Sequence, residues 1–325
     1  MLKHTTLIAL MKYLTQKDTA LTVIDTHAGA GLYRLDGDYT ETSGEALNGI
    51  FRLISESKAA SAQSERTKLA IDSIAKDKPS RAITKALTAP SPASAGEPLA
   101  PALQDYLELL RGLNQQFSET GDPAHLKIYP GSPFIEQKFL SGRDKLKLFE
   151  LHPTDYKSLA GNIDQLGVGR QVTVAREDGF EALKTFLPPP ARRAMVLCDP
   201  SYEIKTDYGR VAQCMADAVK RFATGTYVVW YPLIPRPEAH DLPRKLKTLA
   251  TKAGRSWLDA TLTVKSSKLT TDLQGEVKRP GLPASGMFVI NPPHTLRGEL
   301  QLALPQMVAW LGQDRHAGST LDHGG

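Results

Sequence analysis

Short apolar runs recur along the chain, separated by stretches in which apolar residues have helical spacing. The runs are rich in Val, Ile, Leu and aromatic residues, which favours strands buried on both faces of a sheet. They predict strands over residues 21–25, 145–151, 171–175, 194–199, 226–231, 258–264 and 286–291. Helical spacing predicts helices over residues 2–16, 155–165 and 179–185. We therefore expect an α/β fold with a mainly parallel, seven-stranded sheet that helices cover on both faces.

The helix over residues 2–16 is predicted to be amphipathic. Its apolar run, residues 7–11, is interrupted by Lys12, and no cleavage site typical of a signal peptide follows. No segment approaches the roughly 20 apolar residues that a membrane-spanning helix needs. We expect no membrane association.

The predicted elements divide the chain into three parts. Residues 1–35 hold the first helix and strand of the main domain, and residues 146–325 complete that domain. Residues 36–145 are predicted to be an inserted, mainly helical subdomain. Within it, residues 57–100 are rich in Lys, Ser, Ala and Pro, a composition typical of flexible segments.

The composition argues against a disulfide-rich protein and a metal-binding protein, and it leaves the partner of the chain open. The 325 residues carry a net charge of +5 and a pI of about 9.0, which suits an anionic partner without identifying one. Hydrophobic residues make up 41% of the chain and the mean hydropathy is −0.28, enough for a large core in water. Cys198 and Cys214 form neither a disulfide framework nor a metal spacing, and the histidines are too scattered to bind a metal. We expect a cytoplasmic protein without a metal.

Distinctive residues follow three of the predicted strands, at the edge where parallel sheets bind ligands. Gly29 and Gly31 follow the first strand and let the backbone approach a nucleoside closely. Glu150 ends the second strand and can accept hydrogen bonds from two ribose hydroxyls. Asp178 and Gly179 follow the third, where the carboxylate can accept from an adenine amino group. The simpler interpretations are a tight turn, a solvated carboxylate and a helix N-cap.

The fourth strand ends in Asp199, Pro200, Ser201 and Tyr202. An exocyclic amine on an aromatic ring is a poor nucleophile, because its lone pair is delocalised into the ring. The carboxylate of Asp199 and the carbonyl of Pro200 can accept its two hydrogens and so favour attack by nitrogen. Tyr202 can stack on an extruded base. The alternative is a capped turn before a proline, with the tyrosine in the core.

A similar stretch, Asn291-Pro292-Pro293-His294, follows the last predicted strand. A histidine takes the place of the aromatic residue, and the strand comes last in the order, far from the glycine turn. We interpret this stretch as a structural turn.

Together these residues resemble the bacterial 23S ribosomal RNA adenine-N6 methyltransferases of the RlmJ type. The resembling stretches span nearly the whole chain in one order: LKHT at 2–5, DTHAGAG at 25–31, YPGSP at 129–133, ELHP at 150–153, DGF at 178–180, DPSYEIKTDY at 199–208, KRFATG at 220–225, WYP at 230–232 and ASGM at 284–287. The resemblance implies a Rossmann-like, class I methyltransferase fold. It also implies S-adenosylmethionine as cofactor and N6 of a 23S adenine (position 2030 in the reference bacterial numbering) as the methylated atom.

The resemblance also implies roles for individual residues. Asp199 is expected to be catalytic, with Pro200 and Tyr202 beside it, and Tyr202 and Lys205 are expected to contact the RNA. The residues expected to bind the cofactor are His4, His27, Gly29, Gly31, Ser132, Glu150, Asp178, Gly179 and Asp199. Other basic residues, such as those at 192–193, 220–221 and 278–279, are candidates for RNA contacts or for an ordinary charged surface.

The chain departs from the family pattern in three places. The family usually carries a segment before the Leu-Lys-His stretch that helps form the substrate site, and because this sequence starts at Met1 we expect that leader to be missing. Ser201 replaces the second proline of the usual Asp-Pro-Pro-Tyr motif, and we expect the chemistry to survive. Residues 57–100 are expected to be an additional insertion.

Three alternatives to the RNA methyltransferase stay open. The Asp-Pro-Ser-Tyr motif also suits a DNA adenine methyltransferase or a protein glutamine methyltransferase. A chain without the leader could instead bind cofactor or RNA without catalysing transfer. We expect a monomer that acts on 23S ribosomal RNA.

Overall fold

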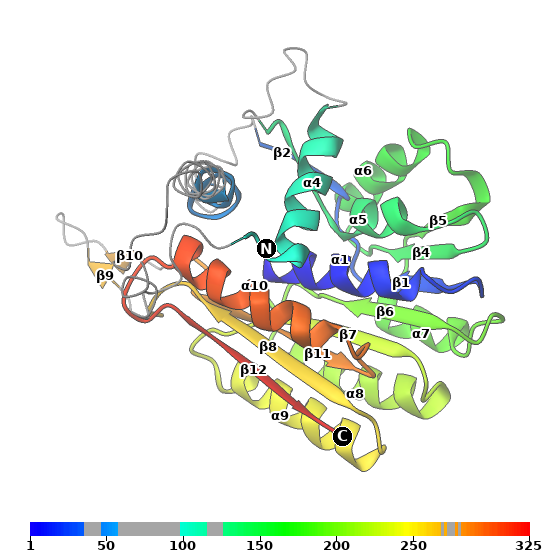
Figure 1. Cartoon of the computed structure of the whole chain (residues 1–325). Helices are drawn as coiled ribbons and strands as arrows, with labels where there is room; N and C mark the ends of the chain where they lie inside the picture. The colour runs from blue at the N-terminus through cyan, green and yellow to red at the C-terminus, as the bar shows by residue number, and fades with distance from the viewer. Residues whose placement is uncertain (36–46, 58–97, 116–125, 268–269, 272–276, 279–280) are drawn as a thin grey trace, which may run out of the picture.

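The computed structural model describes residues 1–35, 47–57, 98–115, 126–267, 270–271, 277–278 and 281–325 (Figure 1). Within these residues the largest sheet has eight strands, in the order β12-β8-β11-β7-β6-β1-β4-β5. Its strands are β1 (Thr22–Asp25), β4 (Lys145–Phe149), β5 (Val172–Ala175), β6 (Ala194–Cys198), β7 (Thr226–Pro232), β8 (Trp257–Thr263), β11 (Ala284–Ile290) and β12 (Gly318–Gly324).

The remaining elements lie around this sheet or in separate two-stranded ribbons. The ribbons pair β2 (Leu32–Arg34) with β3 (Ile128–Pro130) and β9 (Thr270–Thr271) with β10 (Val277–Lys278). The helices are α1 (Leu2–Leu14), α4 (Pro101–Gln115), α5 (Ser132–Phe139), α6 (Pro153–Asp164), α7 (Gly179–Phe186), α8 (Thr206–Arg221), α9 (Pro237–Lys252) and α10 (Leu296–Leu311), with η1 (Leu47–Phe51) and η3 (Gly169–Gln171). None of the helices that the structure describes combines the length and apolar character needed to cross a membrane.

The sheet confirms the predicted α/β fold. Strands β5, β4, β1, β6 and β7 run parallel, whereas β11 is antiparallel to both β7 and β8. All seven predicted strands are present, with ends that move by one or two residues. The eighth strand, β12, was not predicted, and it pairs antiparallel with β8 at the edge of the sheet.

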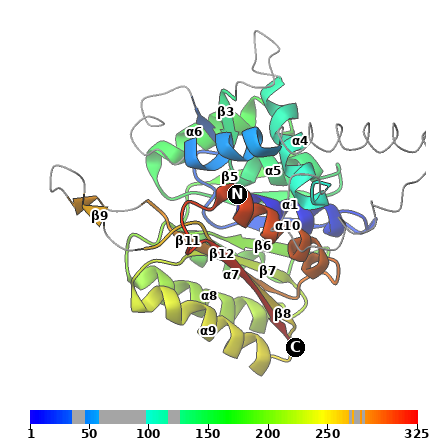
Figure 2. The same ribbon diagram turned by 60° about the vertical axis from the view of Figure 1, so that its left-hand side comes forward.

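The strand residues alternate between two cores, one on each face of the sheet. Val23 and Leu197 pack on the face that α1, α4, α5, α6 and α10 cover. Ile24 and Val196 pack on the other face, with residues of α7, α8 and α9. Figure 2 shows these two groups of helices on opposite sides of the sheet. Because both faces of the central strands β1, β6 and β7 are buried, these strands are mainly apolar, which is why their sequences were recognisable.

Helix α1 is enclosed, and the prediction that it is amphipathic was wrong. His4 to Met11 are all buried, and Lys12 lies beyond this stretch. The helix contacts α4, α5, α10 and strand β11, and Figure 1 shows it between α4 and α10. Burial on nearly all sides explains why apolar residues are not confined to one stripe of the helix.

The chain between β1 and β4 holds the elements of the predicted insertion that the structure describes. These are η1, α4, β3 and α5, and β3 pairs with β2, which lies in the part predicted to precede the insertion. Helices α4 and α5 pack directly on α1, so this part of the chain adjoins the main domain closely. Residues 58–97, which include most of the stretch predicted to be flexible, lie outside the described residues. The three-part division of the chain stays a prediction.

Gly179 shows a close backbone contact between α7 and the end of β1. A Cβ atom there would collide with the carbonyl oxygen of Thr26. We predict that Gly179→Ala lowers the free energy of unfolding by about 2 kcal/mol, since a backbone neighbour cannot turn aside.

The matched control is Gly209→Ala, at an exposed position in the first turn of α8, where a Cβ meets no atom within 4 Å. This variant should keep the parental stability or gain up to about 0.5–1 kcal/mol, because alanine loses less backbone entropy than glycine when it is fixed in a helix. Urea unfolding of both variants measures the difference. Equal stability of the two would contradict the contact.

Candidate active site

A cavity of about 950 Å³ opens at the carboxyl ends of β1, β4 and β6. These strands are neighbours in the sheet, and its order reverses beside β1, the point where open α/β sheets bind ligands. Residues from α1, the strand ends and the β2–β3 ribbon line the cavity: Met1, Lys3, His4, His27, Ala28, Gly29, Tyr33, Tyr129, Gly131, Ser132, Glu150, His152, Asp155, Asp199, Pro200, Ser201, Glu203, Trp230, Leu282 and Ser285.

Asp199 directly follows β6 and is paired with Lys3 from the first turn of α1. The Lys3 ammonium donates to Asp199 Oδ2 at 2.5 Å, and both side chains are largely shielded from solvent. Burial disfavours the charged lysine, but the charge of Asp199 and this hydrogen bond outweigh it, so the pKa of Lys3 is raised. Among the described residues none donates to the other carboxylate oxygen, Oδ1, which leaves it available to a ligand.

Glu150 follows β4 and is held by two backbone amides. Gly29 N donates to its Oε2 at 2.9 Å, and His152 N donates to its Oε1 at 2.8 Å. The carboxylate is therefore fixed against the glycine turn after β1, and each oxygen keeps a lone pair for a further donor. Two hydroxyls on adjacent carbons, as in a ribose, match this arrangement.

Asp25, at the end of β1, supports the floor of the cavity. Its carboxylate accepts from Ser132 Oγ at 2.7 Å and from the amide of His27 at 3.1 Å. Burial raises the pKa of Asp25 to about 6, although these hydrogen bonds and the charge of Lys3 oppose the rise. Because its hydroxyl donates to Asp25, Ser132 is oriented from beneath the cavity. Burial also raises the pKa of Glu136, on α5, well above its ordinary value.

Two of the three histidines that line the cavity, His27 and His4, are neutral near pH 7. Burial lowers the pKa of His27 to about 4, despite the nearby charges of Asp199 and Asp178. Burial, followed by the charge of Lys3, lowers the pKa of His4 well below its ordinary value. The ring of His4 lies 5.2 Å from that of Tyr129, and both of its nitrogens are buried without a partner among the described residues.

Seven of the residues named from the sequence meet in this one cavity: His4, His27, Gly29, Ser132, Glu150, Asp199 and Pro200.

Three other residues named from the sequence do not line the cavity: Tyr202, Lys205 and Gly31. Tyr202 is 2% exposed, its hydroxyl donates to the Trp230 carbonyl at 2.6 Å, and its ring packs on Tyr208. Lys205 is exposed and directly precedes α8. Gly31 faces α6 and accepts the Gly131 amide at 2.7 Å.

Asp178 and Gly179 also lie outside the cavity lining. Asp178 caps α7, since its Oδ1 accepts from the Phe180 amide, and its Oδ2 accepts from Arg210 at 2.5 Å. Burial alone would raise the pKa of Asp178, but these two hydrogen bonds hold the pKa below its ordinary value. The helix N-cap interpretation of Asp178 is therefore confirmed, and both of its oxygens already have a protein partner.

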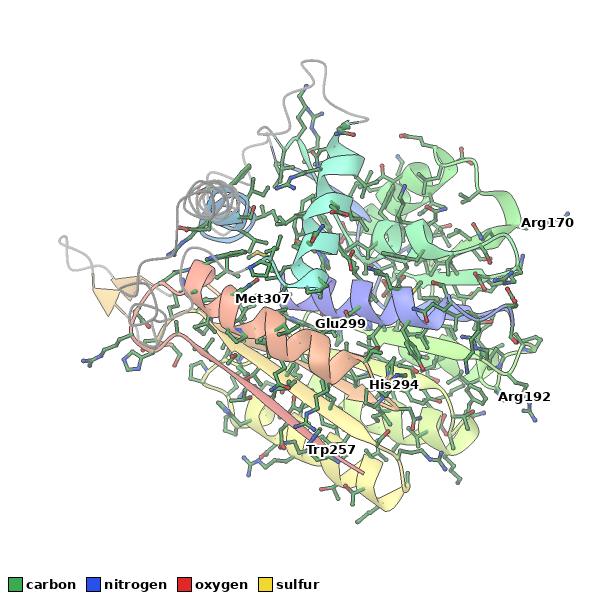
Figure 3. All side chains as sticks on the ribbon, in the orientation of Figure 1. Arg170, Arg192, Trp257, His294, Glu299 and Met307 are labelled. Carbon is green, nitrogen blue, oxygen red and sulfur yellow. The ribbon has the colours of Figure 1, made fainter. Side chains whose placement is uncertain are left out.

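The stretch Asn291 to His294 lies far from the cavity, as predicted. Because β11 is antiparallel, its last residue, Ile290, pairs with Tyr227 near the start of β7. The Asn291 amide group donates to the carbonyls of Ala223 and Gly225, which closes a structural turn. Arg170 and Arg192 precede β5 and β6 and so mark the amino ends of these strands. Figure 3 shows His294 on the same side of the molecule as these two residues.

Sequence reasoning missed the roles of Lys3, Tyr33, Tyr129 and Trp230 in this cavity. Lys3 carried a signal, because a charged residue in the first turn of a buried helix needs a counter-ion. Trp230 lies near the end of β7, beside the end of β6, and the parallel register of these strands indicates that it reaches the same edge. Tyr33 and Tyr129 face each other in the β2–β3 ribbon, a pairing that no local pattern predicts.

Comparison with known proteins identifies the family. The profile of the family described as "Ribosomal RNA large subunit methyltransferase D, RlmJ" matches residues 18–83 and 94–322. The chain belongs to this family. Membership confirms the resemblance seen in the sequence, the class of enzyme and S-adenosylmethionine as the methyl donor.

Two curated relatives and one solved structure are similar over almost their whole lengths. Ribosomal RNA large subunit methyltransferase J of Escherichia coli is 33% identical over 304 residues, 94% of this chain and 86% of the relative. Its namesake from Haemophilus influenzae is 33% identical over 310 residues, 95% and 89% of the two chains. A crystal structure of a Legionella pneumophila protein has a TM-score of 0.71 and 26% identity, covering 99% of this chain and 95% of that one.

The cavity suits S-adenosylmethionine. Gly29 has a φ of +62°, a conformation that residues with a side chain rarely adopt, so glycine lets the turn form without strain. Glu150 offers two fixed acceptors beside that turn, and Ser132 offers a hydroxyl. Neutral histidines at 4 and 27 add no positive charge that would repel a sulfonium. The donors, acceptors and volume match a nucleoside with an amino-acid tail.

Proposed function

We propose that this chain transfers a methyl group from S-adenosylmethionine to the exocyclic N6 of an adenine in 23S ribosomal RNA. Two curated relatives that carry the name of ribosomal RNA large subunit methyltransferases support the RNA substrate. The observation that carries the proposal is the Lys3–Asp199 pair, which lies in the same cavity as Glu150 and the Gly29 turn. A group that can accept hydrogen bonds from an amine and the residues that can hold a nucleoside thus line the same cavity.

Four residues of the cavity hold the cofactor in this proposal. Glu150 accepts hydrogen bonds from the ribose hydroxyls, and Gly29 lets the backbone approach the amino-acid tail. Ser132, held by Asp25, and the neutral ring of His27 complete the contacts. When bound, S-adenosylmethionine supplies a methyl group on a sulfonium, whose C–S bond breaks with its electron pair passing to sulfur.

Asp199 and Pro200 prepare the adenine amine. The free Oδ1 of Asp199 and the carbonyl of Pro200 accept the two N6 hydrogens, which makes the nitrogen lone pair available to form the N–C bond. Lys3 holds the other oxygen and so fixes the direction of Oδ1. The nitrogen then releases one proton, through Asp199, to solvent.

Trp230 provides the aromatic surface of the cavity nearest this pair in the sheet, where the sequence had indicated Tyr202. Stacking on an indole stabilises an extruded base by about 1–3 kcal/mol. Tyr202 supports Trp230 from the core, because its hydroxyl donates to the Trp230 carbonyl and its ring lies 6.0 Å from the indole. Tyr202 is therefore a positioning residue in this proposal, and Lys205 and Asp178 are left without a direct role.

One assay tests the proposed function. Transfer of tritiated methyl groups is measured on unmodified 23S ribosomal RNA, duplex DNA and peptide release factors, followed by nucleoside analysis of the product. The expected result is N6-methyladenosine in the RNA alone. Methylation of DNA or of a glutamine would favour one of the other enzymes, and binding of cofactor without transfer would indicate an inert chain. We also propose that the chain is a monomer and that it acts in the cytoplasm, where ribosomes are assembled.

Asp199→Asn should remove methyl transfer and spare cofactor binding. General-base groups contribute roughly 10²–10⁴-fold to rate, and we expect a loss of about a thousandfold. Calorimetry should give an S-adenosylmethionine affinity within roughly tenfold, about 1.4 kcal/mol, of the parent. The matched control is Asp241→Asn, half-exposed on α9, which should keep the parental rate. Turnover by Asp199→Asn at the rate of the control would overturn the assignment.

Glu150→Ala should act mainly on cofactor affinity. Each hydrogen bond to a charged acceptor contributes about 1.5–3 kcal/mol, so the dissociation constant should rise at least about tenfold. Glu177→Ala, an exposed acid after β5, is the control and should leave the constant unchanged. Saturating cofactor should restore most of the rate of Glu150→Ala. A rate that stays low at saturation would show that Glu150 acts on the transfer step itself.

A further inference from the structure

A second hollow, of about 760 Å³, adjoins the catalytic cavity and is called the basic groove below. It runs between the β2–β3 ribbon and helix α6, and Tyr33 lines both it and the catalytic cavity. The groove is lined by Ala30, Leu32, Tyr33, Arg34, Lys127, Ile128, Lys157, Ser158, Gly161, Asn162 and Gln165. A ligand extending from the catalytic cavity past Tyr33 would enter it directly.

The lining of the basic groove is positively charged. It includes Arg34, Lys127 and Lys157 but no aspartate or glutamate. Within the described ranges no carboxylate forms an ion pair with Lys127 or Lys157, and Lys157 is exposed on α6. Ser158, Asn162 and Gln165 add neutral hydrogen-bonding groups. Cations beside amide and hydroxyl groups are the side chains that contact phosphate and sugar in nucleic-acid complexes.

The walls of the basic groove are connected to the cofactor turn. The ribbon is an antiparallel pair in which Arg34 lies opposite Ile128 and Tyr33 opposite Tyr129. The Asn162 side chain donates to the Ala30 carbonyl at 2.9 Å, which ties α6 to the turn that contains Gly29. The cations are therefore held in a fixed relation to the site where the methyl group is transferred.

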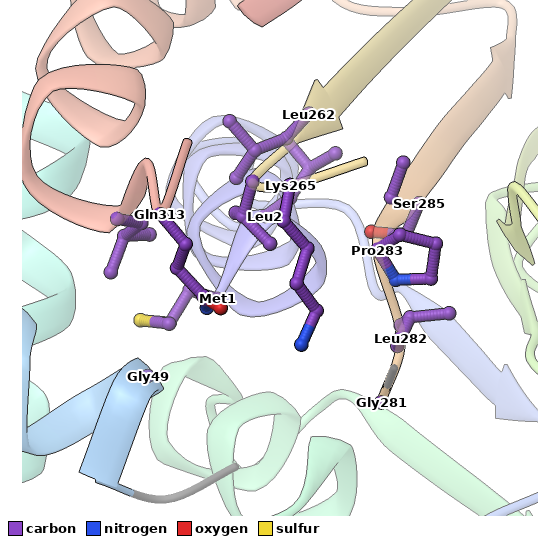
Figure 4. A pocket seen from close by; sticks show the side chains of 13 residues that line it. Met1, Leu2, Gly49, Leu262, Lys265, Gly281, Leu282, Pro283, Ser285 and Gln313 are labelled. Carbon is purple, nitrogen blue, oxygen red and sulfur yellow. The ribbon is translucent and has the colours of Figure 1, made fainter. Parts of the chain in front are cut away.

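The hollow on the other side of the catalytic cavity has a different character. It measures about 240 Å³ and shares Met1, Leu282 and Ser285 with that cavity (Figure 4). Its lining is largely apolar, with Leu2, Leu262 and Leu311, and Lys265 is its only cationic side chain. Such a surface does not suit a chain of phosphates, so charge favours the basic groove.

We propose that the basic groove holds the sugar-phosphate backbone of the substrate RNA next to the target nucleotide, with Tyr33 at the junction. Lys127 and Lys157 contact successive phosphates, while the extruded adenine enters the catalytic cavity. Tyr33, 45% exposed, presents a ring on which the neighbouring base stacks. The inference rests on the proposed function, because the RNA substrate is taken from it.

The test compares Lys127→Gln/Lys157→Gln with two matched variants of the full chain. Lys245→Gln/Lys252→Gln removes the same charge from exposed positions on α9, which packs against β8 near the opposite edge of the sheet from β5. Lys127→Arg/Lys157→Arg keeps the charge in the basic groove. Binding of an unmodified 23S rRNA transcript is measured across a range of salt concentrations, together with S-adenosylmethionine affinity and the KM and kcat of methyl transfer.

Each lost phosphate contact lowers the slope of log K against log salt by about 1, so the Gln pair in the groove should lower it by about 2. The KM for RNA should rise, while kcat and cofactor affinity stay within about twofold of the parent, since these cations do not touch the reacting atoms. The Arg pair and the α9 pair should keep the parental slope. A parental slope for the groove Gln pair, or a fall in kcat with unchanged RNA binding, would overturn the proposal.

This design separates two failures. If the parent binds the transcript but methylates no RNA, the proposed function fails, and the salt slope still reports whether the groove contacts phosphates. If the parent methylates the RNA and the groove variants match it in slope and KM, only the groove is wrong.

Discussion

The ion pair between Lys3 and Asp199 determines much of this structure. Two charges shielded from solvent are costly unless they meet in good geometry, and here the 2.5 Å contact joins the first turn of α1 to the end of β6. The ion pair holds the first turn of α1 against the end of β6, and packing against α4, α5, α10 and β11 holds the rest of the helix. The elements between β1 and β4 thus help to set the position of a charge in the catalytic cavity, although α4 contributes no residue to its lining.

The sheet explains how distant residues come together around that pair. Strands β4, β1 and β6 are adjacent and parallel, so their carboxyl ends present Glu150, the Gly29 turn and Asp199 along one edge. Backbone amides fix Glu150, and Asp25 fixes Ser132, so the groups that face a cofactor are oriented before it binds. Such preorganisation lowers the cost of binding, because fewer side chains must be ordered.

The sequence was sufficient for seven of the eight strands of the sheet and for the acids at their ends. The central strands, which are buried on both faces, are mainly apolar, and the functional residues follow them at once. Strand β12 was missed because Gly318–Gly324 has no apolar pattern and is held by its pairing with β8. Lys3 was missed because its partner lies 196 positions away. Tyr202 was expected at the base, but a φ of +55° turns the chain so that its ring enters the core.

The most direct test of this account is the rate of methyl transfer by Lys3→Met under single-turnover conditions with saturating cofactor. Methionine keeps the apolar length of the side chain and removes the charge that orients Asp199. Because misplacement by about 1 Å can cost roughly a hundredfold in rate, we expect a loss of at least that size, with cofactor affinity within about tenfold of the parent. A parental rate would show that Asp199 does not need its partner, and the central role given to this ion pair would be wrong.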